Sequence, residues 1–173
     1  VYTRSEIQRL LDATARFDKP QFHIAPATFR TLLLVLYGAG LRIGEALALT
    51  LADVDLEAAV LTVRDSKFYK TRLVPLGPDL LAAVRAYAAG RRARRWPQGA
   101  AAAFFVDRSG ARLLVNTVRR AFGRLRTCAG VLRTDGARYQ PRLHDFRHTI
   151  AVHRLTAWYR AGADVQRLLP HLA

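Results

Sequence analysis

The sequence is short of sulfur and of long apolar runs. Cys128 is its only cysteine, which excludes disulfides within the chain and metal sites built from several cysteines. It has no methionine, not even at position 1, so we expect it to be a piece of a longer protein. No apolar run approaches the roughly 18 residues that a membrane span needs, and no secretory signal opens the chain. These absences predict a cytoplasmic protein without a membrane anchor.

Acidic side chains are also scarce: 13 Asp and Glu stand against 28 Lys and Arg, a formal net charge of +15. With 173 residues, 51% of them hydrophobic, the chain predicts one folded domain rather than a disordered basic tail. A folded domain with such an excess repels itself unless an anionic partner meets it. Nucleic acid is the first candidate for that partner, and an acidic membrane surface is the second.

Hydrophobic periodicity predicts a mainly helical domain with one small antiparallel sheet, an α+β class. Thr3 and Glu6 form a capping box, and Asn116 can cap a later helix. Two β-prone runs, 60–63 and 73–74, predict a hairpin, and "AAAFFVDRSG" predicts a further short strand and turn. The expected helices cover 3–15, 26–38, 41–49, 78–95, 117–130, 144–160 and 163–173.

The stretch "RLHDFRHTIA" concentrates positive charge on one side of a predicted helix. His144, Arg147 and His148 lie three and four residues apart and share a face, whereas Phe146 and Ile150 lie on another and can anchor the helix in the core. The face is either a pocket for a phosphate or a solvated basic stripe. A metal site is disfavoured because Arg147 would repel the cation and no Glu follows the first histidine.

A second cluster follows a glycine-marked break in "GAGLRIGEALAL". Glu45 lies about one turn after Arg42 and can hold its guanidinium ready to clamp a phosphate; the alternative is an ordinary surface ion pair. In the hairpin tip, Lys67 and Lys70 either protect the sheet edge or carry an ammonium group into a groove.

Taken together, "GLRIGEAL", "SKFYKTRLVPLG" and "LHDFRHTIA", in this order and spacing, resemble the catalytic domain of tyrosine recombinases, the phage integrase family. The resemblance covers nearly the whole chain, from the capped helix at Thr3 to the last helix. It implies the catalytic-domain fold of that family. It also implies DNA strand exchange, in which a tyrosine hydroxyl attacks a phosphodiester and forms a 3′-phosphotyrosyl link.

The resemblance also implies roles for individual residues. Arg42 and Arg147 would clamp the non-bridging oxygens, and His144 would assist as a hydrogen-bonding or acid–base group. Lys67, or alternatively Lys70, would donate a proton to the leaving 5′-oxygen. No metal and no other cofactor is expected, because protein cations stabilise the developing charge.

Supporting roles follow in the same way. Glu45 would support the Arg42 corner, and His148 is expected to be a structural partner. "LLPH" is similar to the segment that carries the family's second histidine, which assigns that role to His171, with Pro170 in place of the usual glycine.

The nucleophile is not expected among the tyrosines of this chain. In the family it follows the second histidine, and only two residues follow His171 here. Tyr159 is the tempting alternative, but Leu155 and Trp158 beside it indicate helix packing. We therefore expect structural roles for all six: Tyr2, Tyr37, Tyr69, Tyr87, Tyr139 and Tyr159.

Residues 1–173 are accordingly expected to be a catalytic-domain fragment without an N-terminal DNA-clamping domain and without the nucleophile. By resemblance, the complete protein assembles as a tetramer on double-stranded DNA, as an integrase, a resolvase-like recombinase or a transposase, and the fragment is a monomer that cannot cleave unaided. Two other functions stay open: a non-catalytic basic DNA-binding protein, and an enzyme similar to type IB topoisomerases.

Overall fold

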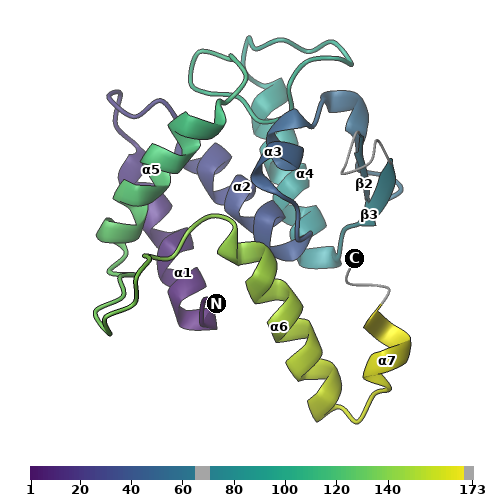
Figure 1. The fold of residues 1–173 in the computed structure, drawn as a ribbon. Coiled ribbons are helices and arrows are strands. Elements are labelled where there is room, and N and C mark those ends of the chain that lie inside the picture. Colours follow the sequence, from purple (N-terminus) through teal and green to yellow (C-terminus); the bar gives the residue numbers. More distant parts are fainter. Residues whose placement is uncertain (65–70, 170–173) are drawn as a thin grey trace.

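The computed structural model describes residues 1–64 and 71–169; the hairpin tip with Lys67 and Lys70, and His171, lie outside the described residues. The elements are α1 (Arg4–Ala13), η1 (Thr14–Phe17), α2 (Pro26–Gly38), α3 (Ile43–Ala48), η2 (Leu51–Asp53), β1 (Val54–Asp55), β2 (Val60–Val63), β3 (Arg72–Pro75), α4 (Pro78–Arg92), α5 (Val115–Cys128), α6 (Asp145–Arg160) and α7 (Val165–Leu168) (Figure 1). Helices dominate, as the periodicity predicts. Within the described residues, none of these helices is long and apolar enough to cross a bilayer.

The first two helices start where their sequences predict. Thr3 and Glu6 close the capping box: the Glu6 amide donates to Thr3 Oγ1 at 3.1 Å, and the Thr3 amide donates to Glu6 Oε2 at 2.7 Å. Pro26 occupies the first turn of α2, where its missing N–H costs nothing. Seven residues of α2 are buried, so this helix lies in the middle of the core and α4 and α6 pack against it.

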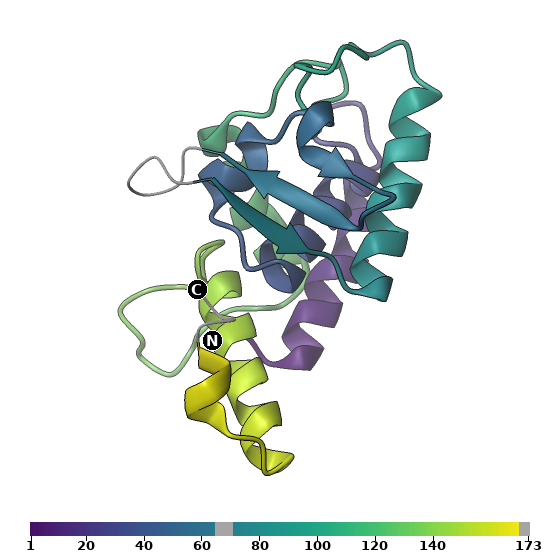
Figure 2. The ribbon, with the colours of Figure 1, turned by 90° about the vertical axis from the view of Figure 1, so that its right-hand side faces the viewer.

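The sheet is a three-stranded antiparallel one in the order β1-β2-β3, and Figure 2 looks onto it. The predicted hairpin is confirmed, with Val63 opposite Arg72 and Val60 opposite Pro75. β1 was not predicted, because two residues are too few to show an alternating pattern. The strand expected in 101–110 is replaced by isolated bridges, one joining Thr50 to Ala103.

The predicted starts of two helices were wrong. Asn116 does not cap α5, because the helix already begins at Val115 and Leu114 occupies the cap position. Leu113, the residue before the cap, is buried in the core. The last helix, expected from 163, begins at Val165, where the Asp164 side chain accepts a hydrogen bond from the Arg167 amide at 3.2 Å.

The first half of α6 is fixed to the body of the domain by the N-terminal segment. The Tyr2 amide donates to Thr149 Oγ1 at 2.9 Å, and the Tyr2 hydroxyl donates to the Arg142 carbonyl at 2.8 Å. The Tyr2 ring packs on Phe146, with centroids 4.7 Å apart. Farther along α6, His153 Nδ1 lies 2.8 Å from the hydroxyl of Tyr37 on α2.

The two halves of α6 differ in burial. Phe146 is fully buried, as predicted, whereas Ile150 is only half-buried. The packing role expected for Tyr159 is wrong, since its side chain is 81% exposed. The reason is visible in Figure 1, where the end of α6 extends beyond the rest of the domain, with α7 beside it.

Replacing Phe146 with alanine is expected to lower the free energy of unfolding by about 3–5 kcal/mol, because it removes a buried ring and leaves a cavity. Urea denaturation of residues 1–173 measures this. Tyr159→Ala on the exposed half of the same helix is the control and should change stability by less than about 0.5 kcal/mol. Equal effects of the two substitutions would contradict the assignment of Phe146 as the anchor of α6.

Candidate functional site

The glycine break between α2 and α3 supplies the acceptor for one predicted site residue. Gly40 has φ +63°, a left-handed conformation that glycine adopts without the steric cost of a side chain. Its carbonyl accepts a 2.6 Å hydrogen bond from Arg147 Nη1 on α6. Two residues later the chain enters α3, with Arg42 at the N-cap. The break therefore brings Arg42 and Arg147 to the same corner of the domain.

Glu45 holds Arg42, as its spacing in the sequence predicts. Glu45 Oε1 accepts from Arg42 Nη1 at 2.9 Å, and Oε2 accepts from the Arg42 backbone amide at 2.9 Å. The expected contact is thus confirmed. Because both groups of Arg42 bind one carboxylate, the orientation of this side chain is fixed before any ligand arrives.

Arg72 is a member of this cluster that sequence reasoning missed. It is the first residue of β3, and its guanidinium binds Glu45 in bidentate fashion, with Nη1 3.1 Å from Oε1 and Nη2 2.9 Å from Oε2. A usable signal was present. Residues alternate between the two faces of a strand, so Arg72 shares a face with Val74, which packs against the core.

The electrostatics of the cluster reflect three guanidinium groups around one carboxylate. Burial by itself raises the pKa of the Glu45 carboxyl, but the hydrogen bonds from Arg72 and Arg42 outweigh burial and hold this pKa at about 2. Burial lowers the pKa of Arg147; the charges of Arg42 and Arg72 lower it further, and that of Glu45 opposes them. With Glu45 ionised, the formal charge of the four groups is three minus one, or +2.

A cavity of about 390 Å³ opens beside this cluster, between the end of α2, β3 and α6. Arg72, Arg147 and His148 line it, and Arg154 lines it two helical turns beyond Arg147. A net positive cavity with oriented guanidinium groups can hold a phosphate-sized anion and oppose negative charge that develops on it.

The two histidines of α6 lie together, as their i, i+4 spacing predicts: the rings of His144 and His148 are edge to face with centroids 4.8 Å apart. The pKa of His144 is lowered, first by burial and then by the positive charge of His148, with a smaller opposing effect of Asp145. His144 is consequently favoured as the neutral imidazole at pH 7. Within residues 1–64 and 71–169, no group of three or more His, Cys, Asp or Glu could hold a metal ion.

We expect His148→Ala to raise the pKa of His144, because the substitution removes a neighbouring positive charge and exposes the His144 ring to water. NMR titration of the imidazole resonances of residues 1–173 measures both values. In the unsubstituted chain the pKa of His144 should lie below 6.5, its ordinary value. His153→Ala, on the far side of the helix, serves as the control and should leave it unchanged. An unshifted His144 in His148→Ala would contradict this interaction.

Two of the described tyrosines lie in the core. Tyr2 and Tyr87 are buried, and burial raises the pKa of both hydroxyls, which makes them poorer nucleophiles. Structural roles are therefore confirmed for these two. Tyr69 lies outside the described residues.

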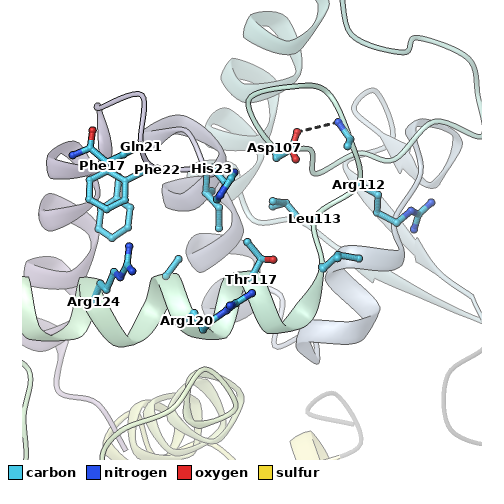
Figure 3. A pocket seen from close by; sticks show the side chains of 14 residues that line it. Phe17, Gln21, Phe22, His23, Asp107, Arg112, Leu113, Thr117, Arg120 and Arg124 are labelled. Carbon is cyan, nitrogen blue, oxygen red and sulfur yellow. Dashed lines mark hydrogen bonds between the residues drawn. The ribbon is translucent and has the colours of Figure 1, made fainter.

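A second hollow, of about 560 Å³, lies between the loop that precedes α2, the turn at 107–114 and α5 (Figure 3). Its rim is basic: Arg120 and Arg124 come from α5, and Arg112 donates to the carbonyls of Leu47 and Ala48 at the end of α3. Of the site residues predicted from the sequence, none that the structure describes lines it.

The domain is mainly helical with a small antiparallel sheet, and its arginine–carboxylate cluster lies beside a cationic cavity that can accommodate a phosphate group. The family model of the phage integrase family matches residues 1–172, and the chain belongs to this family.

Two curated relatives illustrate the similarity. The chain is 41% identical over 175 residues to a Sinorhizobium fredii protein provisionally named integrase/recombinase y4rB; the match covers 100% of this chain and 55% of that protein. It is 38% identical over 145 residues to tyrosine recombinase XerC of Rhodospirillum centenum, covering 82% of this chain and 38% of XerC. The chain thus spans about half the length, or less, of the curated relatives it matches.

Solved structures confirm the fold class. The crystal structure of a XerA recombinase superposes with a TM-score of 0.68 at 25% identity, over 95% of this chain and 52% of that one. The Tn1549 transposon integrase, solved in complex with transposon right end DNA, gives a TM-score of 0.68 at 21% identity, over 96% of this chain and 55% of that one.

Proposed function

We propose that the chain is the catalytic domain of a site-specific DNA recombinase that cleaves and rejoins strands through a 3′-phosphotyrosyl intermediate. The observation that carries the proposal is the meeting of Arg42 and Arg147 in one cluster around Glu45, although these arginines lie far apart in the sequence. The chain also belongs to the phage integrase family, which supports a role of this cluster in DNA recombination.

The proposed reaction exchanges one phosphoester bond for another. A tyrosine oxygen forms a bond to phosphorus, the bond from phosphorus to the 5′-oxygen breaks, and that oxygen takes up a proton. Negative charge grows on the two non-bridging oxygens during the attack. Arg42 and Arg147 would contact these oxygens, and their fixed orientation would stabilise the transition state without further reorganisation. His144, held neutral, can donate or accept a hydrogen bond there.

Three further roles rest on the resemblance alone. Lys67, with Lys70 as the alternative, would protonate the leaving 5′-oxygen, and His171 would act as the second histidine. His148 would support His144, whose ring it contacts. No cofactor has a part in this scheme.

Double-stranded DNA is the proposed partner. The net charge of +15 and the exposed arginines of α5 support it. So do the structures of similar recombinases with DNA, among them XerH on its difH site and a lambda integrase dimer on a core site. We propose that the complete protein acts as a tetramer on two duplexes and that residues 1–173 alone are monomeric.

We further propose that the nucleophilic tyrosine and a DNA-clamping domain belong to parts of the complete protein beyond residues 1–173. The chain matches only 55% of y4rB and 54% of a second S. fredii relative, which leaves room for such parts.

A suicide DNA substrate, nicked so that cleavage cannot reverse, tests the function. The complete gene product should form a covalent protein–DNA adduct through a tyrosine, visible on a denaturing gel, whereas residues 1–173 should bind the duplex without forming one. Duplex binding without any adduct from the complete gene product would overturn the proposal in favour of a non-catalytic DNA-binding protein. An adduct on one of the six tyrosines of this chain would refute the proposed location of the nucleophile.

A further inference from the structure

We propose that Arg72 is a positioning residue of the cleavage site: it acts through Glu45, which it holds in the orientation that fixes Arg42. This inference rests on the proposed function. Arg72 is no part of the catalytic set that the resemblance implies, and its role follows from the contacts of one carboxylate.

Glu45 accepts four hydrogen bonds from residues that the structure describes, two on each oxygen. Arg42 supplies one from its backbone and one from its side chain, and Arg72 supplies the other two. Without Arg72, the carboxylate would keep only the two bonds from Arg42, both within the first turn of α3. It could then rotate about its side-chain torsions and carry the Arg42 guanidinium with it. The bidentate bond from another element removes this freedom.

Arg72 and Arg42 differ in how deeply their side chains are buried. The Glu45 side chain is 10% exposed and that of Arg72 is 25% exposed, whereas that of Arg42 is 44% exposed. The Glu45–Arg72 pair therefore forms the inner layer, and Arg42 lies on the outer side of it. The Arg42 guanidinium donates one hydrogen bond to Glu45. A guanidinium has five N–H donors, so others remain that can face an incoming phosphate.

The position of Arg72 in the sheet makes it a firm anchor. It begins β3 and pairs with Val63, a buried residue of β2. Its backbone is thus tied to the sheet while its side chain reaches the start of α3. The Glu45–Arg72 contact therefore joins α3, and with it Arg42, to the sheet.

Charge favours the same arrangement. Arg72 lowers the pKa of Glu45 by hydrogen bonding, which keeps the carboxylate ionised over the whole physiological range. Lysine at position 72 would keep the charge but lose the two-point geometry. If orientation is the role of Arg72, lysine cannot replace it; if charge alone matters, lysine suffices.

The test measures single-turnover cleavage of the suicide substrate by the complete gene product. Arg72→Ala and Arg72→Lys should each lower the cleavage rate about 10–100-fold, by analogy with the loss of a group that orients a metal ligand, while duplex affinity changes less than about threefold. In a Glu45→Ala background, Arg72→Ala should cause no further loss, because residues that act through one another are not additive.

Arg64→Ala is the matched control. Arg64 follows β2 directly, and its Nε lies 2.6 Å from Asp53 Oδ1, so it is another arginine at the sheet, paired with a carboxylate other than Glu45. This variant should cleave at the unsubstituted rate. Full activity of Arg72→Lys, or rate losses from Arg72→Ala and Glu45→Ala that multiply, would overturn the positioning role.

A binding experiment on residues 1–173 separates this inference from the proposed function. Orthovanadate is titrated into the chain while the side-chain N–H resonances of its arginines are followed by NMR. The Arg42 resonance should shift in the unsubstituted chain, and Arg72→Ala should weaken vanadate binding and broaden that resonance. The proposed function fails if the complete gene product forms no adduct; the role of Arg72 fails if Arg42 is unaffected in Arg72→Ala. Urea denaturation identifies unfolded variants, and Arg72→Gln replaces Arg72→Ala if the latter does not fold.

Discussion

Replacing Arg147 with alanine should lower the rate of DNA cleavage by the complete gene product on the order of 10²–10³-fold, the usual cost of losing one preorganised donor to the transition state. Arg147 is half-buried, its Nη1 is held by the Gly40 carbonyl at 2.6 Å, and it borders the cavity beside Arg72. The alanine variant loses this donor. Water that fills the space carries no oriented positive charge to replace it. Single-turnover kinetics on the suicide substrate measures the effect.

Duplex affinity should change far less, since one phosphate contact among many accounts for a salt-dependence slope of only about 0.9. Arg154→Ala is the control, because Arg154 lines the same cavity two turns away but is exposed. It should lower affinity slightly and leave the cleavage rate within a factor of a few. An Arg147→Ala variant that cleaves as fast as Arg154→Ala would remove Arg147 from the catalytic set.

The affinity of residues 1–173 for a 30-base-pair duplex should fall about 10³–10⁵-fold between 50 and 200 mM salt, if the domain neutralises some six to ten phosphates. The physical reason is the excess of 28 basic over 13 acidic residues, which releases counterions from the DNA on binding. Fluorescence anisotropy over a salt series gives the slope of log affinity against log salt.

The arginines at the rim of the hollow in Figure 3 provide a variant for this measurement. Substituting both Arg120 and Arg124 with alanine should reduce the slope by about two units, one for each lost phosphate contact. Arg16→Ala is the control, because its guanidinium donates to the Cys128 carbonyl at 3.2 Å. An affinity that barely responds to salt would contradict DNA binding through phosphates.

Local sequence signals predicted most of the fold. The capping box at Thr3, the proline at the start of α2 and the two β-prone runs of the hairpin each depend on neighbours within a few residues, and each is confirmed. The wrong predictions arose where tertiary packing decides the outcome. Asn116 does not cap α5, which already begins at Val115, and Tyr159 is exposed near the end of α6, where that helix extends beyond the rest of the domain.

The same division runs through the candidate site. The Arg42–Glu45 contact was predictable, because residues three apart meet at the start of any helix. The contacts of Arg147 with Gly40 and of Arg72 with Glu45 span 107 and 27 residues. Such pairs depend on how helices and sheet pack, and no spacing rule specifies them. In the hairpin, Lys67 and Lys70 were considered as site residues from the sequence, and Arg72 was not.

The Gly40 carbonyl that accepts the hydrogen bond from Arg147 limits what a substitution at position 40 can change. The acceptor is a main-chain atom, so every amino acid at position 40 would still carry it, and no codon change can delete it. What a change can do is rotate it, since a residue with a side chain resists the +63° torsion found there. A substitution at position 40 would therefore change the orientation of Arg147 without removing its hydrogen-bond acceptor. A second substitution that restores the local backbone conformation could restore that orientation.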